Sequence, residues 1–310
     1  MIQVDYKAMV QGVLDDIDRR LTDKNIRMEN IRIDELARAV NYSTWHFSRV
    51  FLALTGTPVM AYVARRKLAH ALYDLSRGKR VIDVAMDYGF ETHAGFTRAF
   101  RKCYGCPPSL YHLHVAAQPP ERATIESVKK MMHGGIAMQV RIREIPPFAV
   151  AGVTSRHALP NVKRSADIPA YWNTLKVDCG EHLTRVYDAF EPARHGEYAL
   201  CFEVDEDMGE FTYLLGVAFD DGTDEANLEP DMRKAEIPGG LYAVFATPKA
   251  PSEQYPQSIA DTWAEILTRW LPASPYEYDD ARLGFEAYDE RDHAWLHDGM
   301  AQMDIYVPII

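Results

Sequence analysis

Apolar residues in the first third of the chain recur every three or four positions, which is the spacing of one helix face. Two such sets follow one another closely: Ile33, Leu36, Ala37 and Val40, then Phe47, Val50, Phe51 and Leu54. Beyond residue 138 the pattern changes to short alternating runs, typical of strands, with helical stretches at about 166–190 and 255–271. The chain is therefore predicted to have a helical region followed by a region of mixed strands and helices.

The helical region contains the same unit twice. The segments Phe47-Ser48-Arg49-Val50-Phe51 and Phe96-Thr97-Arg98-Ala99-Phe100 are 49 residues apart and share their aromatic and basic positions. Before each segment stands a residue that tolerates a left-handed backbone, followed by one that can cap a helix; the pairs are Asn41 with Ser43 and Gly89 with Thr92. Each copy is therefore predicted to be a helix, a tight turn and a second helix.

The second helix of each copy carries polar residues on the face away from its apolar stripe. In the first copy this face holds Trp45, Ser48 and Arg49, and in the second copy Thr97 and Arg98 recur at the same places. Arg reads guanine edges through two hydrogen bonds, and Ser or Thr can reach a phosphate or a base. This recurrence favours DNA contact, although packing against a neighbouring helix stays open for Trp45 taken alone.

The connection between the two copies is predicted to be one continuous helix. It begins with Thr57-Pro58, a cap followed by proline at the first helical position, and runs to Gly78. About 20 residues span roughly 30 Å, and successive major-groove faces of B-DNA lie about 34 Å apart. Such a helix could place two recognition helices in adjacent major-groove segments, with Arg65, Arg66 and Lys67 adding basic charge.

Charge is distributed unevenly along the chain. The net charge is −11, but residues 1–115 hold 17 Lys and Arg against 12 Asp and Glu, while residues 116–310 hold 17 against 33. A basic module can approach phosphates, whereas an acidic module is repelled by them. DNA contacts are therefore expected in the first region only.

Two segments resemble the AraC family of bacterial regulators, in particular its MarA and Rob branch: IDELARAVNYSTWHFSRVFLALTGTPVMAYVARRKL and IDVAMDYGFETHAGFTRAFRKCYGCPPSLY. The resemblance covers about residues 8–113. It implies a seven-helix domain that binds asymmetric double-stranded DNA sites as a monomer, and we expect RNA polymerase as a further partner. By position it implies DNA contacts at Trp45, Ser48 and Arg49 in the first motif and at His93, Ala94, Gly95, Thr97 and Arg98 in the second. Ala94 and Gly95 depart from the longer polar residues of the relatives.

The second half of the chain contains a weaker repeat. Residues 143–152, REIPPFAVAG, resemble residues 235–246, AEIPGGLYAVFA, and in each copy two strands precede a helix. Two further strands follow each helix, at about 198–205 and 211–219, then at 282–288 and 302–308. We predict a tandem helix-turn-helix domain at 1–115, a linker at 116–136, and an α+β domain at 137–310. The last consists of two β-β-α-β-β-like repeats with an antiparallel sheet, leaving a groove near a pseudo-twofold axis.

A single carboxylate stands out in the last repeat. Alternation in strand 283–288 sends Glu286 and Tyr288 to the face opposite Phe285, and a carboxylate beside aromatic rings attracts cations. Solvation of Glu286, or pairing with Arg282, remains an alternative. The IPPFAVAGV and IPGGLYAVFA openings, the Ile168-Pro169-x-x-Trp172 helix and the GFEAYD segment resemble GyrI-like effector domains.

That resemblance implies a pocket for a small amphipathic, often cationic, effector with Glu286 at its base. The candidate ligand-binding residues are Glu286, Tyr288, Trp172, Tyr171, Tyr242 and Phe245. For the last four, packing in the hydrophobic core is an equally weighted alternative. The pocket could also serve a hydrolase, as in some GyrI-like domains, or be a remnant within a protein-interaction module.

Other classes of protein are not supported by the sequence. No apolar run reaches the roughly 20 residues of a membrane span, and the N-terminus lacks a signal core, so we expect a cytoplasmic protein that does not contact a membrane. Four cysteines are too few for a disulfide framework, and Cys103 and Cys106 are expected to pack in the core. We expect no catalytic residue, no metal site and no cofactor, because no nucleophile elbow, metal motif or phosphate loop is present.

Overall fold

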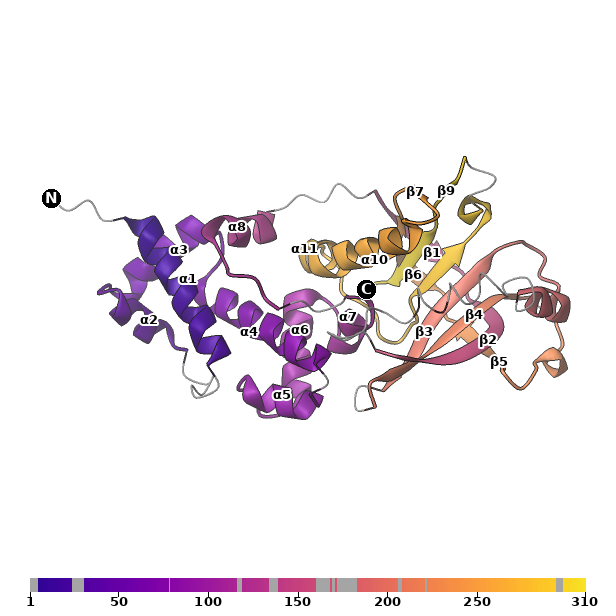
Figure 1. Ribbon diagram of the computed structural model, residues 1–310, viewed down its shortest axis with the longest axis horizontal. Coiled ribbons are helices and arrows are strands. Elements are labelled where there is room, and N and C mark those ends of the chain that lie inside the picture. The colour runs from indigo at the N-terminus through magenta and orange to yellow at the C-terminus, as the bar shows by residue number, and fades with distance from the viewer. Residues whose placement is uncertain are drawn as a thin grey trace. The chain divides into compact units, whose positions relative to one another are not determined.

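The computed structural model describes residues 5–23, 31–77, 79–115, 119–133, 139–159, 168, 171, 183–205, 208–220, 222–293 and 298–310. The chain divides into two compact units (Figure 1). The first comprises Met1–Tyr104 and Ala117–Ile136, and the second comprises Gly105–Ala116 and Ala137–Ile310. Two segments are assigned differently from the predicted boundaries. Residues 105–115, predicted to end the helical domain, belong to the second unit, and residues 117–136, predicted to be a linker, belong to the first.

The helices of the first unit are α1 (Tyr6–Thr22), α2 (Ile33–Ala39), α3 (Thr44–Thr55), α4 (Val59–Ser76), α5 (Val81–Asp87), α6 (His93–Tyr104) and α8 (Ile125–His133). The predicted turns occur where expected, because Asn41 and Gly89 have φ angles of 61° and 79°. The caps form as well: the Ser43 hydroxyl accepts from the His46 N–H at 3.3 Å, and the Thr92 hydroxyl accepts from the Gly95 N–H at 3.0 Å. The two helix-turn-helix units are therefore α2–α3 and α5–α6, joined by α4.

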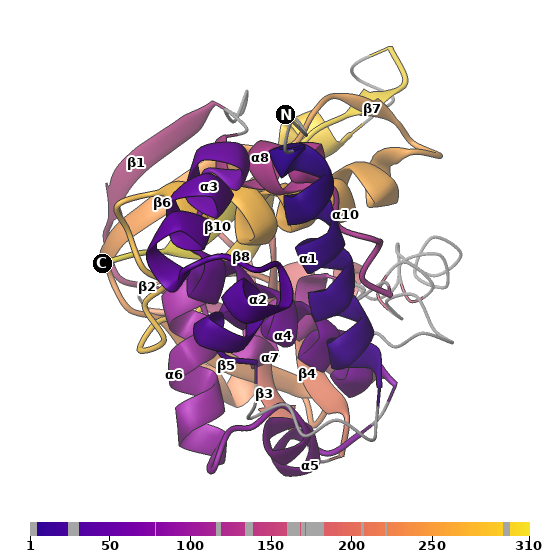
Figure 2. The ribbon, with the colours of Figure 1, turned by 90° about the vertical axis from the view of Figure 1, so that its left-hand side faces the viewer.

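Helices α1, α3 and α8 lie side by side (Figure 2), and they share one hydrophobic cluster with α4. Its fully buried members include Leu14 of α1 and Phe47 and Phe51 of α3, and Ile125 and Val128 of α8 pack against them. The predicted linker 116–136 thus contains a helix that closes the core of the first unit. Local sequence did not indicate this helix, since it depends on an apolar face supplied by α1 and α3.

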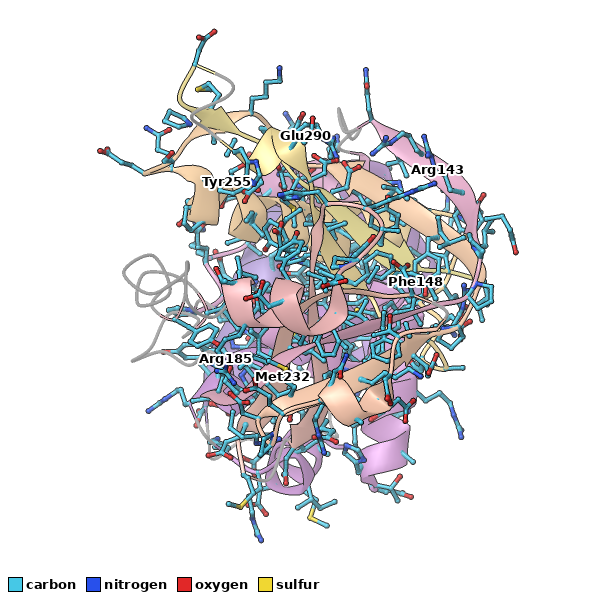
Figure 3. The ribbon with its side chains drawn as sticks, turned by 90° about the vertical axis from the view of Figure 1, so that its right-hand side faces the viewer. Arg143, Phe148, Arg185, Met232, Tyr255 and Glu290 are labelled. Carbon is cyan, nitrogen blue, oxygen red and sulfur yellow. The ribbon has the colours of Figure 1, made fainter. Side chains whose placement is uncertain are left out.

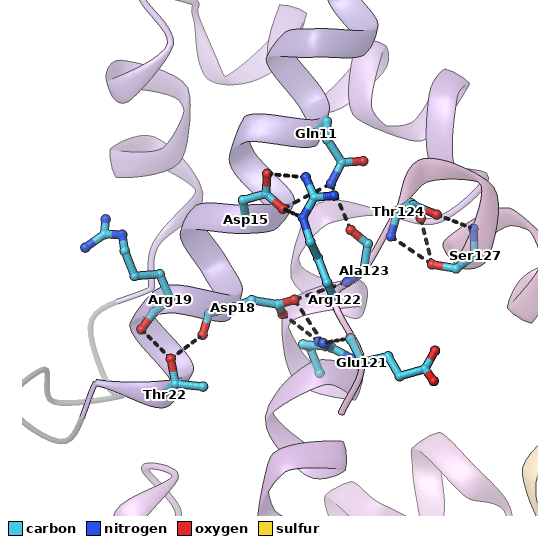
Figure 4. A network of polar contacts seen from close by, with 11 residues as sticks. Gln11, Asp15, Asp18, Arg19, Thr22, Glu121, Arg122, Ala123, Thr124 and Ser127 are labelled. Atoms are coloured by element: carbon cyan, nitrogen blue, oxygen red, sulfur yellow. Dashed lines mark hydrogen bonds and ion pairs between the residues drawn. The ribbon is translucent and has the colours of Figure 1, made fainter. Parts of the chain in front are cut away.

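Polar contacts fasten the segment before α8 to α1 (Figure 4). The Arg122 guanidinium donates two hydrogen bonds of 2.8 Å to the Asp15 carboxylate, and the pKa of Asp15 is lowered by these bonds. Arg66 of α4 donates to both carboxylate oxygens of Asp18 at 2.5 and 2.9 Å, and its side chain is only 11% exposed. Arg66 is therefore a structural residue of the first unit rather than a free cation for phosphate.

The second unit contains an eight-stranded antiparallel sheet together with α7 (Pro108–His114). Its strands are β1 (Val140–Ile145), β2 (Phe148–Ala158), β3 (Glu197–Asp205), β4 (Glu210–Phe219), β5 (Met232–Ile237), β6 (Gly240–Ala246), β8 (Phe285–Tyr288) and β10 (Asp304–Pro308). A helix covers 183–190, and α10 (Tyr255–Glu265) continues through a π-helical turn, η3 (Ile266–Trp270), into α11 (Leu271–Ala273). Two short strands, β7 (Ala250–Pro251) and β9 (Met300–Ala301), pair separately. Of the remainder of the predicted helix 166–190, residues 168 and 171 are helical, and the others lie outside the described residues.

The strand order reveals the duplication more clearly than the sequence does. The order is β1-β6-β10-β8-β3-β4-β2-β5, and it reads the same when the two repeats are exchanged and the list is reversed. The pseudo-twofold axis therefore passes between β3 and β8, the two central strands. The first strand of each repeat pairs with the second strand of the other repeat: β1 pairs with β6, and β5 pairs with β2.

The two faces of the sheet bury different side chains. Phe285 packs on one face with Leu200, Leu214 and Tyr242, and its ring meets that of Phe148 edge-on at 5.5 Å (Phe148 is labelled in Figure 3). By alternation Glu286 and Tyr288 point to the other face. No single helix among the described residues is long and apolar enough to cross a membrane; α3 and α4 pass that test only as a pair bent by 61°.

Candidate functional site

The first surface predicted to recognise DNA is the outward face of α3. Phe47 and Phe51 anchor the opposite face in the core with no exposed surface, which leaves Trp45 67% exposed and Arg49 exposed beside it. The Arg49 guanidinium lies 4.7 Å from the centroid of the Trp45 ring, a cation–π contact that orients both groups. Ser48 is on the same face, and its hydroxyl donates to the Thr44 carbonyl at 2.6 Å. These three side chains form a continuous polar and aromatic surface.

The second surface predicted to recognise DNA lies on α6, and its exposed side chains are only some of the predicted ones. Phe96 and Phe100 are fully buried, and His93, Ala94 and Arg98 are exposed as expected. Thr97 differs, because its hydroxyl oxygen is buried without a hydrogen-bond partner within the described structure. The second motif therefore presents His93 and Arg98 outward, while the hydroxyl of Thr97 faces the protein.

A small pocket in the second unit is built around Glu286. This residue is in β8 directly opposite Ala199 of β3, at the centre of the sheet. Its carboxylate accepts a hydrogen bond from the indole N–H of Trp263 in α10 and another from the hydroxyl of Tyr288, both at 2.7 Å. The predicted grouping of Glu286 with Tyr288 agrees with this geometry, and Trp263 completes an aromatic frame around the carboxylate.

Two opposing effects act on the charge state of Glu286. Burial raises the pKa of Glu286, and the hydrogen bonds from Trp263 and Tyr288 oppose that rise because they stabilise the charged form. No ion pair with Glu286 occurs in the described part of the chain. The expected alternative partner, Arg282, instead donates to Asp279 at 2.7 Å and to the Ile309 carbonyl at 2.9 Å. The Glu286 carboxylate is therefore buried among aromatic rings, and no basic side chain among the described residues forms an ion pair with it.

Space in the pocket is limited by α7. The cavity is about 20 Å³, which is room for one water molecule and far less than a drug-sized ligand needs. Its lining comes from α7, β3, β8 and α10 with the loop before β8: Leu110, Leu113, His114, Ala199, Cys201, Trp263, Tyr278, Gly284, Phe285 and Glu286. Three side chains of α7, those of Leu110, Leu113 and His114, thus form part of the wall of this small cavity.

Three other predicted pocket residues, Tyr242, Phe245 and Tyr171, do not line this cavity, and the fourth lies outside the described residues. Tyr242 is fully buried on the opposite face of the sheet, where Arg282 lies over its ring at 4.9 Å. Phe245 is fully buried against Trp270 at a centroid distance of 4.8 Å. Tyr171 meets His157 edge-on at 4.8 Å, in a separate aromatic cluster, and Trp172 lies outside the described residues. Tyr242 and Phe245 therefore serve the hydrophobic core.

One group of side chains has the composition of a metal site, although none was expected. His195, Glu197 and His293 place one ligand atom each within 4.8 Å of one another. The Tyr187 hydroxyl donates to the Glu197 carboxylate at 2.8 Å and lies 3.4 Å from Nδ1 of His195. This hydroxyl therefore bridges two of the three groups.

The sequence matches two protein-family models, one for each region. Residues 36–113 match a helix-turn-helix domain, and residues 141–309 match the integron-associated effector binding protein family. The first match includes α3, α6 and all of α7 except His114. The second covers more than half of the chain and includes Glu286 and Trp263.

Two relatives and one solved structure are each similar to part of the chain. The chain is 35% identical over 104 residues to "Probable transcription factor PqrA" of Proteus vulgaris, covering 33% of this chain and 85% of that protein. It is 31% identical over 107 residues to "HTH-type transcriptional activator AarP" of Providencia stuartii, covering 34% and 75%. A solved structure, the integron cassette protein VCH_CASS2 of Vibrio cholerae, aligns with a TM-score of 0.36 and 20% identity, covering 55% of this chain and 95% of that one.

Proposed function

The chain belongs to the integron-associated effector binding protein family and carries an AraC-type helix-turn-helix domain, and from this we propose that it is a transcription regulator controlled by an aromatic cation. The helix-turn-helix domain reads double-stranded DNA, and the domain at 137–310 binds the effector. One observation carries the choice of ligand: the Glu286 carboxylate is enclosed by Trp263 and Tyr288 and forms no ion pair in the described structure.

DNA recognition is proposed to use side chains from both recognition helices. Trp45, Ser48 and Arg49 extend from α3, and His93 and Arg98 extend from α6. Thr97 would contact DNA only after a side-chain rotation that exposes its buried hydroxyl. The protein acts in the cytoplasm, and RNA polymerase is the further partner that an activator would contact; AarP, one of the relatives, is named as an activator.

The ligand class follows from the chemistry of the pocket. Aromatic side chains supply flat faces for stacking, and the carboxylate supplies the charge that a cation needs when it leaves water. A unit charge about 4 Å from Glu286 would gain on the order of 4 kcal/mol at an effective dielectric constant near 20, before desolvation is subtracted. A neutral molecule of the same shape would gain only the stacking.

Replacing Glu286 by glutamine is expected to weaken binding of a flat aromatic cation about tenfold or more, because the amide keeps the shape of the carboxyl group without its charge. The measurement is a fluorescence titration of the full chain with N-methylacridinium and with acridine, which is uncharged in slightly alkaline buffer. Affinity for acridine should change little. Glu144→Gln removes an exposed carboxylate from β1, away from the pocket, and serves as the control.

Other results would redirect the proposal. Equal affinity of wild type and Glu286→Gln for N-methylacridinium would leave Glu286 a structural carboxylate and remove the stated ligand class. Turnover of esters of similar shape, abolished by the same substitution, would replace sensing by hydrolysis. Capture of a protein partner by the second unit, with no small-molecule binding, would favour an interaction module.

A further inference from the structure

Helix α7 lines the small cavity that also contains Glu286. The His114 imidazole stacks on the Trp263 indole with ring centroids 3.7 Å apart and planes only 10° from parallel. The same indole donates its N–H to Glu286 at 2.7 Å. Leu110 and Leu113 complete the lining from α7, and Leu113 is only 6% exposed. A flat ring is therefore already stacked over the aromatic and acidic floor of the pocket.

His114 offers the shape of a planar ligand without the charge. Burial lowers the pKa of His114 to about 3, so its imidazole is neutral near pH 7. A neutral imidazole stacks on Trp263 but does not neutralise Glu286. An aromatic cation could do both, and this difference gives it an advantage over His114 for the same place.

The position of α7 is fixed at its beginning. The Gly105 carbonyl accepts a hydrogen bond from the Tyr278 N–H at 3.0 Å, and Cys106 is only 1% exposed. Gly105 has a φ of 75°, and a Cβ there would lie 2.9 Å from the Leu271 side chain, so the close approach needs glycine. Beyond this anchor α7 has seven residues and no side-chain N-cap. A helix this short depends on its packing for stability.

This helix is also the continuation of the second recognition helix. Tyr104 ends α6 and Gly105 begins the segment that leads into α7, and the match to the helix-turn-helix domain runs to residue 113. The segment that fills the effector pocket is thus covalently joined, through a single turn, to the helix that presents His93 and Arg98. Because so few residues connect the two helices, a movement of α7 would also displace the C-terminal end of α6.

We propose that α7 is an internal occupant of the effector pocket and that an aromatic cation binds by displacing it. Displacement releases the segment that follows α6, which is how ligand binding reaches the DNA-binding surface. The identity of the ligand rests on the proposed function above. The displacement itself rests on the stack between His114 and Trp263 and on the small remaining cavity.

The test exploits competition between helix and ligand. When only a fraction of molecules is open, the apparent affinity is reduced by that fraction. Leu113→Ala and His114→Ala weaken the docking of α7, so each should bind N-methylacridinium about tenfold more tightly than wild type in the full chain. His112→Ala lies on the same helix outside the pocket lining and should keep the wild-type affinity. Thermal unfolding of each variant checks that it is folded.

Hydrogen exchange of the wild-type chain provides the second readout. With saturating N-methylacridinium, backbone amides of residues 109–115 should exchange faster, while those of β8 exchange more slowly. Unchanged or slower exchange in α7, or a fall in affinity in His114→Ala, would overturn displacement and place His114 among the ligand contacts. Tight binding with equal affinity in all variants would overturn this inference alone. No binding by wild type or by either opened variant would overturn the proposed ligand class as well.

Discussion

Replacing Arg49 by alanine is expected to weaken binding to the specific DNA site by about 1–3 kcal/mol, the usual contribution of one bidentate contact between arginine and a base. Arg49 extends from the outward face of α3, and its guanidinium is held 4.7 Å from the Trp45 ring centroid. A guanidinium oriented in this way loses less conformational freedom when it meets a guanine edge. The loss on DNA of unrelated sequence should be much smaller.

Gel-shift titrations on the selected site and on a scrambled sequence measure this difference. Arg38→Ala is the matched control, since Arg38 is an exposed arginine on α2 that pairs with Asp34. It removes one positive charge from the same unit without altering α3. An equal loss on both DNA sequences would make Arg49 a phosphate contact, and no loss on either would remove it from the interface.

Replacing Gly152 by alanine is expected to destabilise the second unit by about 3 kcal/mol or more, in the upper range for overpacking. Gly152 of β2 faces Gly216 of β4 directly in the sheet. A Cβ at Gly152 would lie 2.1 Å from the Leu215 carbonyl oxygen and 2.3 Å from the Gly216 Cα. These are backbone atoms of the neighbouring strand, so no change of rotamer relieves the clash and the strands must separate.

Thermal unfolding and limited proteolysis of the full chain test the Gly152 prediction. The second unit should unfold at lower temperature and be cleaved sooner, while the first unit remains folded. Gly12→Ala is the control, because Gly12 lies in α1 with no atom near its missing Cβ. That substitution should stabilise the chain slightly, by about 0.5–1 kcal/mol. An unchanged unfolding temperature for Gly152→Ala would contradict the close approach of β2 and β4.

The helical unit could be predicted almost completely from the sequence because its determinants are local. Asn41 and Gly89 adopt the left-handed turns that their residue types favour, and Ser43 and Thr92 cap the helices that follow. Apolar spacing identified the buried faces of α3 and α6. Arg66 was misjudged, since its partner Asp18 is 48 residues away and nothing in the local pattern connects the two.

The order of the strands in the sheet could not be predicted from local sequence. Alternation grouped the strands correctly and placed Glu286 beside Tyr288, but the exchange of β1 and β5 between the repeats depends on pairings between distant segments. The same limit applied to the pocket. Trp263 was indistinguishable from a core tryptophan, and His114 carried no local signal of its stack on Trp263, 149 positions later in the sequence. Alternation along β6 could not show which of its side chains lie on the same face of the sheet as Glu286.

The central claim is that this chain recognises a DNA sequence and that an aromatic cation alters this recognition. Its most direct measurement is the sequencing of DNA fragments retained by the purified full chain, with and without N-methylacridinium. We expect a shared asymmetric sequence that is enriched by wild type, lost in Arg49→Ala, and changed in occupancy by the cation in wild type but much less in Glu286→Gln. Retention of fragments without any common sequence, or a common sequence whose occupancy ignores the cation, would contradict it.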